Sequence, residues 1–412
     1  MNRYPCITGL GFITSIGHGA AAVLDSLRAG RSGLGPFPHT WSDQSPIRVA
    51  GTLDGFDTSA EDPAQWSYPD SISLPRNIAR SASPQILYSF GALAQALDDA
   101  GIDPGEPRLR SAALYAASAG SPMLLHRHLD YLKSTRGRRA NPAGVLSSIS
   151  GTLNFALGAH FGIEGGNCGF VSACTSSAHA LGYALEDLRQ KRVETAVIVA
   201  AEDLTPESLL PFAGMRALST RPDKYASRPF DQHRDGFVPT GGAVALILEL
   251  RDRPSGYAWL RDWHHSSDGH DMAISHPEGD GIYRAMRGLA QRSGIQPHDL
   301  DYINAHATST RTGDRSEATG IVRFLGDAHV PVSSTKGITG HGLSMAGAME
   351  AAFSTLMVKH NFIAGNPHLE TPDPAAAPLH LPIPSLERPV RRIISNSCGF
   401  GGSNVSLLLE TS

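Results

Sequence analysis

Short apolar runs alternate with amphipathic stretches along most of the chain. Several runs have the length and composition of β-strands, and they span residues 6–11, 112–117, 195–201, 243–250, 302–306, 330–334, 392–397 and 403–410. Between them, apolar residues recur at helical spacing over 86–97, 180–188 and 345–356. Strands that alternate with helices in this way predict a layered α/β fold.

Two segments interrupt this alternation. Arg-Asp-Arg-Pro-Ser-Gly at 251–256 breaks the pattern near the middle of the chain and predicts a junction between two halves, 1–252 and 253–412. The segment 35–75 is rich in Pro, Ser, Asp and Trp without a clear period, so we expect it to run over the surface.

Length and charge narrow the class of protein. With 412 residues, of which 41% are hydrophobic, the chain can form one large α/β unit or two domains with substantial cores. The net charge of −4 comes without a long run of one sign, so we expect no binding to nucleic acid or to anionic membranes. The N-terminus lacks the pattern of a signal peptide, and no stretch reaches the roughly 18 apolar residues of a membrane span. We therefore expect a cytoplasmic protein.

Cysteine usage agrees with a reducing compartment and singles out one thiol. The four cysteines are too scattered for a disulfide framework, and no two of them form a C-x-x-C pair. Cys174 stands just before the amphipathic run 180–188, where the positive end of a helix dipole favours a thiolate. Taken alone, a cysteine among small residues is more often a buried small hydrophobe.

Three further side chains make a reactive Cys174 the better interpretation. His306 closes an apolar strand, and His341 follows another, with Lys336 five residues before it. In α/β sheets, ligand chemistry concentrates where strand ends release the chain into loops. Two imidazole N–H donors that converge on one carbonyl oxygen would stabilise an enolate, and a thiol can hold an acyl group as a thioester. This set predicts acyl transfer with carbon–carbon bond formation rather than hydrolysis.

Five motifs in a fixed order carry a family resemblance. They are SACTSSAH at 172–179, RPFDQHRDGFV at 228–238, NAHATST at 304–310, STKGITGH at 334–341 and SNSCGFGGSN at 395–404. Together they resemble the signatures of the β-ketoacyl-acyl carrier protein synthases, the elongating type I and II ketosynthases of the thiolase superfamily. The resemblance extends over essentially the whole chain. It implies a thiolase-like fold, in which two similar βα halves form a five-layered α-β-α-β-α core.

The resemblance also implies an activity and its partners. Such enzymes are acyltransferases that join a Cys-bound acyl group to malonyl-acyl carrier protein in fatty-acid or polyketide synthesis, with loss of carbon dioxide. They work as homodimers, or as heterodimers with a chain-length partner. Substrates arrive on the phosphopantetheine arm of the carrier protein, and we expect no other cofactor and no metal.

Residue roles follow from the matching motif positions. Cys174 corresponds to the acyl-accepting nucleophile, His306 and His341 to the residues that bind the malonyl carbonyl, and Lys336 and Glu350 to residues that support them. The backbone N–H groups of Cys174 and Phe400 correspond to an oxyanion hole. A gating loop beside the nucleophile corresponds to Cys398, Gly399, Gly401 and Gly402. Thr308 and Thr310 correspond to a pair that binds the phosphopantetheine arm. Asp314 and Glu317 match acidic positions to which we assign a structural role.

Basic residues are candidates for docking the acidic carrier protein. They are Arg76, Arg80, Arg136, Arg138 and Arg139, the last three of which form a dense cluster. The alternative interpretation is a solvated charged loop.

Some positions depart from the family pattern. Ala307 and Arg311 replace a glycine and a proline, and Cys398 replaces a phenylalanine. Loss of that ring either enlarges the acyl pocket or frees the gating loop. The Cys398 thiol could also react with the acyl carbon, and we favour a pocket-shaping role over a chemical one. These departures leave open a specialised homologue that transfers or cyclises acyl groups without elongating them. A non-catalytic partner subunit is disfavoured because Cys174 and both histidines are present.

A second group of histidines invites a metal interpretation. His264, His265, His270 and His276 lie close together in sequence, but their spacing matches no compact ligand pattern. We expect no metal there.

Overall fold

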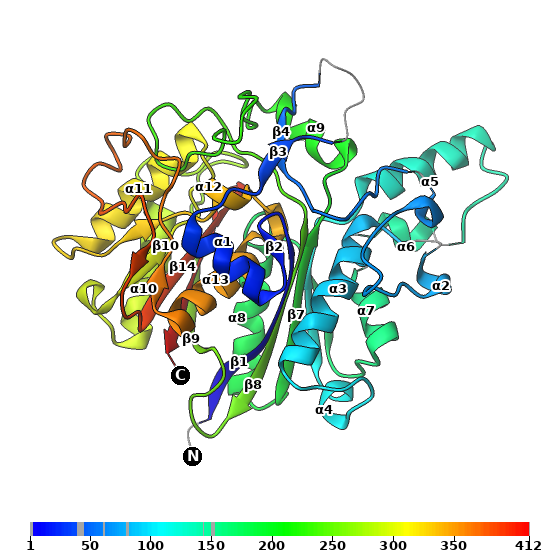
Figure 1. The fold of residues 1–412 in the computed structure, drawn as a ribbon, viewed down its shortest axis with the longest axis horizontal. Coiled ribbons are helices and arrows are strands. Elements are labelled where there is room, and N and C mark those ends of the chain that lie inside the picture. The colour runs from blue at the N-terminus through cyan, green and yellow to red at the C-terminus, as the bar shows by residue number, and fades with distance from the viewer. Residues whose placement is uncertain are drawn as a thin grey trace.

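The computed structural model describes residues 3–38, 45–60, 62–79, 82–142, 144–149 and 153–411. Its centre is one large mixed sheet built from two halves (Figure 1). The first half contains β1 (Tyr4–Thr14), β5 (Ala113–Ala117), β6 (Asn167–Phe170), β7 (Thr195–Glu202) and β8 (Gly242–Arg251). The second contains β9 (Ala258–Ser267), β10 (Tyr302–Asn304), β11 (Val332–Ser333), β14 (Arg392–Gly399) and β15 (Ser403–Thr411).

The two halves repeat one topology. Their strand orders are β6-β5-β7-β8-β1 and β11-β10-β14-β15-β9, so each half places its third, second, fourth, fifth and first strands side by side. In both, the fifth strand runs antiparallel to its two neighbours, while the others pair in parallel. A short antiparallel pairing between Cys6 and Trp259 and between Ile7 and Ala258 joins the halves.

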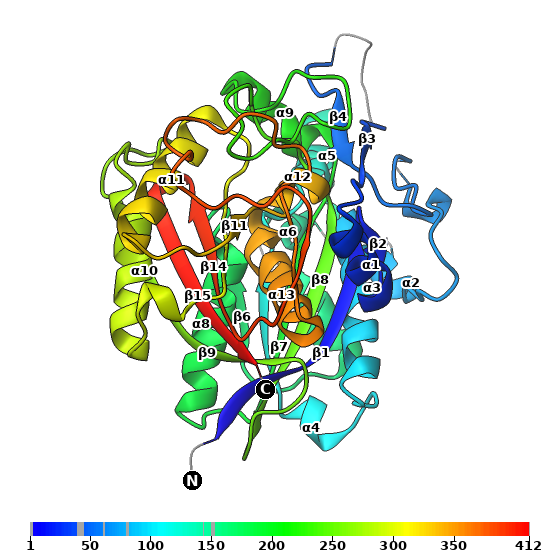
Figure 2. The same cartoon turned by 60° about the vertical axis from the view of Figure 1, so that its left-hand side comes forward.

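Helices form three layers around these sheets (Figure 2). The central layer contains α8 (Ser176–Arg189) and α13 (Ala346–His360), which pack against each other between the two half-sheets. Outside them, α3 (Pro84–Asp99) and α7 (Leu153–Phe161) cover the first half, and α10 (Asp280–Ser293) and α11 (Arg311–Leu325) cover the second. The five-layered thiolase-like fold is therefore confirmed.

The alternation of side chains along each strand creates these layers. On β7, Ile198 belongs to the central core with α8 and α13, whereas Val197 and Val199 belong to the core under α3. Both faces are apolar because both are covered, as is usual for parallel sheets.

Shorter elements complete the chain. They are β2 (Gly17–His18), α1 (Ala20–Ala29), β3 (Leu34–Pro36), β4 (Val49–Gly51), η1 (Pro63–Gln65), α2 (Arg76–Ala79), α4 (Pro107–Arg110), α5 (Pro122–Ser134), α6 (Gly144–Ser148), α9 (Pro206–Gly214), η2 (Pro297–Asp299), α12 (Lys336–Thr339), η3 (Leu343–Met345), β12 (Phe362–Ile363), β13 (Leu386–Glu387) and η4 (Phe400–Gly402). No helix in the described ranges combines the length and apolar character needed to cross a membrane.

The sequence patterns did not predict two strands of the large sheet, β6 and β9, and the prediction for the segment 35–75 was wrong in part. The strand β6 is short and glycine-containing, and β9 was hidden by polar His264 and His265 at its end. The segment 35–75 is not simply a surface excursion, because Phe37, Ile47 and Trp66 are buried in its described part. Its apolar side chains are spaced irregularly, so no period revealed the packing.

Candidate active site

The reactive side chains come from both halves and meet where the strands end. Cys174 lies between β6 and α8, and His306 follows β10. His341 follows α12, and its backbone N–H donates to Val238 O at 2.7 Å. The equivalent layout of the two halves therefore brings three distant motifs to one place.

Cys174 lies in a tight turn just before α8. Ala173 has φ of +53°, an uncommon conformation for a residue with a side chain. The hydroxyl of Thr175 donates to Ser172 O at 2.6 Å, and α8 begins at Ser176. The turn and the helix start together fix the position of Cys174.

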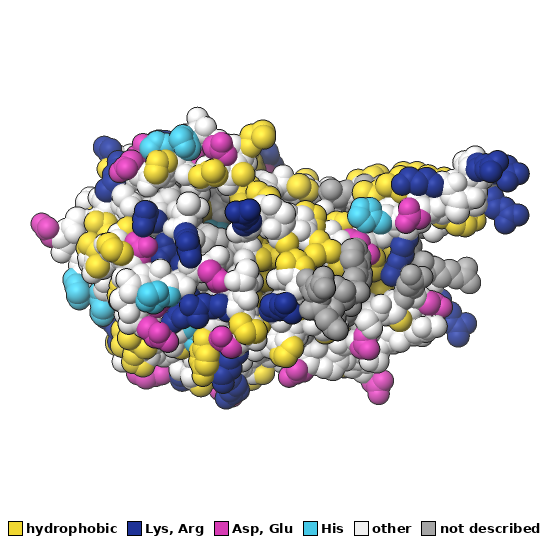
Figure 3. Space-filling view, turned by 90° about the horizontal axis from the view of Figure 1, so that it is seen from above, with side chains coloured by type: hydrophobic (Ala, Val, Ile, Leu, Met, Phe, Trp, Pro, Cys, Tyr) yellow, Lys and Arg dark blue, Asp and Glu magenta, His cyan; other side chains and the backbone are white. Residues whose placement is uncertain are grey.

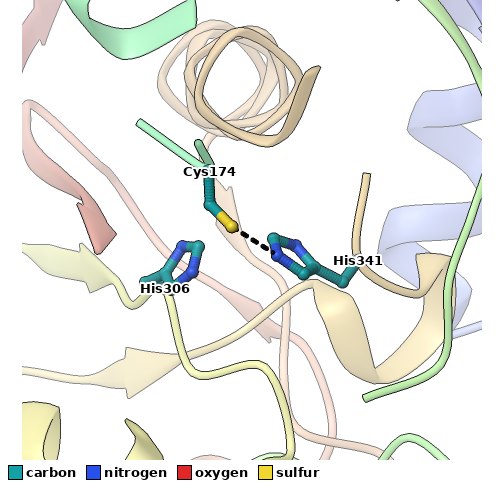
Figure 4. A group of neighbouring side chains, drawn as sticks. All are labelled: Cys174, His306 and His341. Atoms are coloured by element: carbon teal, nitrogen blue, oxygen red, sulfur yellow. Dashed lines mark hydrogen bonds between the residues drawn. The ribbon is translucent and has the colours of Figure 1, made fainter. Parts of the chain in front are cut away.

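Cys174, His306 and His341 form a buried cluster (Figure 4). The sulfur of Cys174 lies 3.1 Å from Nε2 of His341. The imidazoles of His306 and His341 are 5.1 Å apart between ring centres and nearly perpendicular, at 86°. One imidazole thus contacts the thiol, while the other stands beside it.

Burial changes the expected state of the thiol. It raises the pKa of Cys174 to about 12, although the Lys336 cation opposes this shift. The expectation that the start of a helix would stabilise a thiolate is therefore wrong for the resting protein. Cys174 precedes the first helical residue by two positions, and the loss of hydration outweighs the dipole.

Both imidazoles are neutral for a related reason. Burial lowers the pKa of His306 and of His341 well below the ordinary value, and the Lys336 cation adds to both shifts. Nζ of Lys336 lies 3.3 Å from Nδ1 of His306. An ammonium can only donate, so Nδ1 accepts and Nε2 of His306 carries the proton.

Glu350 balances the charge of Lys336. The two form a fully buried ion pair, with the ammonium donating to Oε1 of Glu350. Burial raises the pKa of Glu350 to about 7, and the attraction of Lys336 opposes that rise. Removal of either partner would leave the other charge buried and uncompensated.

Two buried carboxylates shape the loop that carries His306. Glu317 accepts the backbone N–H groups of His306 and Ala307 at 2.8 and 2.6 Å. Asp314 accepts the backbone N–H of Ser309 at 3.0 Å. Their predicted structural role agrees with these contacts, since each carboxylate bonds to backbone of the loop.

A cavity of about 310 Å³ leads from Cys174 to the surface. Thr308 and Thr310 line it, and their hydroxyls lie 3.0 Å apart. Cys398 and Arg311, two of the departures from the family pattern, line the same cavity. Burial raises the pKa of the Cys398 thiol well above its ordinary value, and the Glu317 and Asp268 carboxylates add to the rise.

The Gly-rich loop lies directly against the nucleophile. A Cβ at Gly399 would lie 3.3 Å from the backbone nitrogen of Cys174 and 3.3 Å from Ser172 O, so a side chain there would crowd the turn that carries the nucleophile. Gly401 and Gly402 have φ of +76° and +68°, which glycine adopts readily. Phe400, which follows Gly399 in the same loop, lines the cavity.

The predicted docking residues lie away from the cavity. Arg76 begins α2, and Arg136, Arg138 and Arg139 are exposed just after α5. None of these four lines the cavity. Arg80 lies outside the described residues.

The donor atoms of Cys174, His306 and His341 lie within 4.8 Å of one another, close enough to bind a metal ion together. Within the described ranges, His264, His265, His270 and His276 form no such group. The rings of His270 and His276 are 5.0 Å apart between centres, and His264 and His265 lie on β9.

Sequence reasoning overlooked one buried carboxyl group next to the site. Glu202 ends β7 and accepts the backbone N–H of Ala119 at 3.1 Å and the hydroxyl of Ser344. Burial raises its pKa to about 8. Glu202 could have been predicted as a site residue because it ends an apolar strand, which is the same pattern that selected His306.

Comparison with known proteins agrees with this geometry. The chain matches the family models for the β-ketoacyl synthase N-terminal domain over residues 5–253 and C-terminal domain over residues 257–370. The chain belongs to the β-ketoacyl synthase family. This β-ketoacyl synthase is thus an acyltransferase, as the sequence resemblance implied.

Similar proteins cover this β-ketoacyl synthase over its full length. It is 34% identical to 3-oxoacyl-[acyl-carrier-protein] synthase 1 of Escherichia coli K12, with 98% of each chain covered. It resembles the solved ishigamide ketosynthase/chain length factor at 26% identity, with a TM-score of 0.88 and complete coverage of both chains. A type II polyketide ketosynthase solved in complex with its acyl-carrier protein shares the fold, with a TM-score of 0.86 at 23% identity and complete coverage of both chains.

Proposed function

We propose that this β-ketoacyl synthase condenses an acyl group held on Cys174 with malonyl-acyl carrier protein, releasing carbon dioxide, in fatty-acid or polyketide synthesis. The observation that carries the proposal is a thiol in contact with one neutral imidazole and next to a second. The name of the Escherichia coli relative supports the same reaction.

In the first step, Cys174 takes the acyl group from its thioester. The sulfur attacks the acyl carbon, the bond to the arm's sulfur breaks, and one thiol replaces another, so no net proton is lost. His341 Nε2, at 3.1 Å, can stabilise charge that develops on the sulfur of Cys174. We assign the oxyanion hole to the backbone N–H groups of Cys174 and Phe400, which the close approach of Gly399 supports.

In the second step, malonyl thioester loses its carboxylate. The bond between the methylene and the carboxylate carbons breaks, carbon dioxide leaves, and the electron pair forms an enolate. N–H groups from His306 and His341 would stabilise the enolate oxygen. Their lowered pKa values are compatible with this role, because a neutral imidazole still carries one N–H donor.

In the third step, the enolate carbon attacks the thioester on Cys174. The tetrahedral oxyanion collapses, the bond to Cys174 sulfur breaks, and the 3-oxoacyl product leaves on the carrier arm. The thiolate then takes up one proton. The thiol and the two imidazoles supply this chemistry, so we propose that no resident cofactor or metal takes part.

We place carrier docking on the basic cluster formed by Arg136, Arg138 and Arg139. In Figure 3, dark blue side chains gather at the tip of the arm that extends from the body of the molecule. Exposed arginines suit an acidic partner because complementary charge steers association.

We also propose a homodimer that forms at the β6 edge. The opposite edge strand, β11, is covered, since Val332 N donates to His380 O at 2.9 Å. By contrast β6 is exposed, and Val171 next to it has 61% of its surface exposed. An uncovered edge in an otherwise buried parallel sheet favours pairing with a second copy. We expect the wild-type protein to have a molar mass in solution of twice 43.7 kDa. The Val171→Asp variant should have the mass of one chain, because a charge at the edge would disrupt pairing.

The unpaired state of all four cysteines suits a reducing compartment, and we propose the cytoplasm.

Product analysis tests the proposed reaction. The protein is incubated with an acyl primer and malonyl-carrier protein labelled in the carboxylate, and products are identified by mass. Released label together with a primer extended by two carbons supports the proposal. Acyl exchange without released label would instead support the non-elongating transferase.

A further inference from the structure

The cavity that begins at Cys174 ends at the surface beside two arginines. Arg216 follows α9, and Arg311 is the first residue of α11. Both line the cavity and both are exposed, whereas Cys174 and His341 at its other end are buried. In Figure 3, dark blue side chains surround a hollow on the face seen from above.

These two guanidinium groups have donors to spare. Arg311 donates its Nε–H to Arg234 O at 3.2 Å. Among the described residues, no carboxylate pairs with Arg311 or Arg216, and the side chain of Arg216 has no hydrogen-bond partner. Nearby Arg234 differs, since it is buried and pairs with Asp314 and Asp373.

The acidic groups of the cavity have partners already. Asp235 accepts the hydroxyls of Ser219 and Thr220 at 2.6 and 2.9 Å. Glu317, the other acid in the cavity lining, is buried and accepts backbone N–H groups of the His306 loop. The cationic charge at the exposed end is therefore not neutralised by an ion pair within the described chain.

Arg216 also has an unusual backbone conformation. Its φ is +54°, which costs energy in a residue other than glycine. This conformation ends α9, because the backbone N–H of Arg216 donates to Ala213 O at 2.9 Å and that of Ala217 donates to Phe212 O at 3.1 Å. The helix end therefore fixes the backbone of Arg216 where this residue lines the cavity.

We infer that Arg216 and Arg311 bind the phosphate of the phosphopantetheine arm that carries the substrate. The inference rests on the proposed function, because a thioester at Cys174 places the arm along the cavity past Thr308 and Thr310. The arm's phosphate then reaches the exposed end. Guanidinium groups match phosphate oxygens in geometry as well as charge.

The arm phosphate can be tested without any carrier protein. Malonyl-phosphopantetheine and malonyl-pantetheine differ only in the phosphate, so their kcat/KM ratio for decarboxylation isolates its recognition. We expect the ratio to be about ten in the wild-type enzyme, to fall about fivefold in R216A or R311A, and to approach one in the double variant. The control is R221A, because Arg221 lies nearby and donates to His233 O but does not line the cavity.

Carrier-bound and coenzyme A substrates separate the two sources of such a phosphate. If the arginines bind the arm phosphate, the double variant loses kcat/KM with malonyl-carrier protein as well as with malonyl-coenzyme A. Loss confined to coenzyme A would assign the arginines to nucleotide phosphates and overturn the inference. An unchanged phosphate ratio, or an equal loss with malonyl-pantetheine, would overturn it too.

Binding keeps this test independent of turnover. Calorimetry should show tighter binding of phosphopantetheine than of pantetheine to the wild-type protein and equal binding to the double variant. If binding shows that difference while no substrate loses carbon dioxide, the proposed function fails and the phosphate site stands. If decarboxylation proceeds but binding shows no difference, the site fails alone.

Discussion

The sulfur of Cys174 contacts Nε2 of His341 at 3.1 Å, and among the described residues it makes no hydrogen bond with His306. The two imidazoles therefore have different access to the two half-reactions. On the proposed mechanism, we expect His341 to act while the acyl group is transferred to Cys174, and His306, whose Nδ1 lies 3.3 Å from Lys336 Nζ, to act in the decarboxylation that follows.

Replacement of each histidine by asparagine should separate these half-reactions. H306N is expected to lower decarboxylation of malonyl-carrier protein about 10²- to 10³-fold, as loss of one oxyanion donor does, and to leave acylation of Cys174 nearly unchanged. H341N should slow both. Release of labelled carbon dioxide measures the first, and the mass of the acylated protein measures the second. Equal losses of acylation in the two variants would refute the division of roles.

Alkylation of Cys174 reports the state of its thiol. Because burial raises its pKa to about 12, the rate of reaction with iodoacetamide should keep rising with pH up to at least pH 10. Mass analysis of the Cys174 peptide distinguishes it from exposed Cys168. A plateau below pH 8 would show instead that the resting enzyme holds a thiolate.

Cys398 offers a paired substitution. If its side chain shapes the pocket, C398S should keep most activity, and C398F should shift preference toward shorter primers because a ring fills part of the cavity that Cys398 lines. Competition among primers of several lengths measures the preference. A strong loss in C398S, with normal acylation of Cys174, would support a chemical role.

Charge reversal tests carrier docking. R138E together with R139E should raise KM for malonyl-carrier protein several-fold and leave KM for malonyl-pantetheine unchanged. The control variant is R253E, because Arg253 is exposed two residues after the last residue of β8 and is not part of the basic cluster. The docking proposal would be wrong if the double variant changed both KM values alike.

Glu202 predicts a pH dependence of stability. Its pKa is about 8 in the folded protein against an ordinary value of 4.5, so the folded state binds the extra proton between these values. The free energy of unfolding of wild type relative to E202Q should fall as pH rises from about 4.5 to 8, by up to about 1.4 kcal/mol per pH unit. Urea unfolding at several pH values measures the slope. A difference that grows with pH would mean that Glu202 is ionised in the fold.

Much of the architecture could be predicted from local patterns. Buried strands such as β7 and β8 are continuous apolar runs, and α3 and α13 repeat apolar residues at helical spacing, so their places along the chain were clear. The strand β6 was not predicted because its exposed, glycine-containing sequence has neither signal.

The site was predictable in its chemistry and not in its electrostatics. Strand-end positions selected His306 and His341, and the start of a predicted helix selected Cys174. The structure brings the three together. The pKa of Cys174 could not be predicted, because it depends on burial by residues far away in sequence. Arg216 was missed for the same reason, since its relation to Arg311 exists only after both halves have folded.

The most direct test of the account follows Cys174 through one turnover by intact-protein mass. Wild-type protein mixed with an acyl donor should gain the mass of one acyl group, which C174S should not gain. Malonyl-carrier protein added next should remove that mass and yield a product two carbons longer than the primer. Acylation that persists after malonyl-carrier protein is added, or product formed by C174S, would contradict the account.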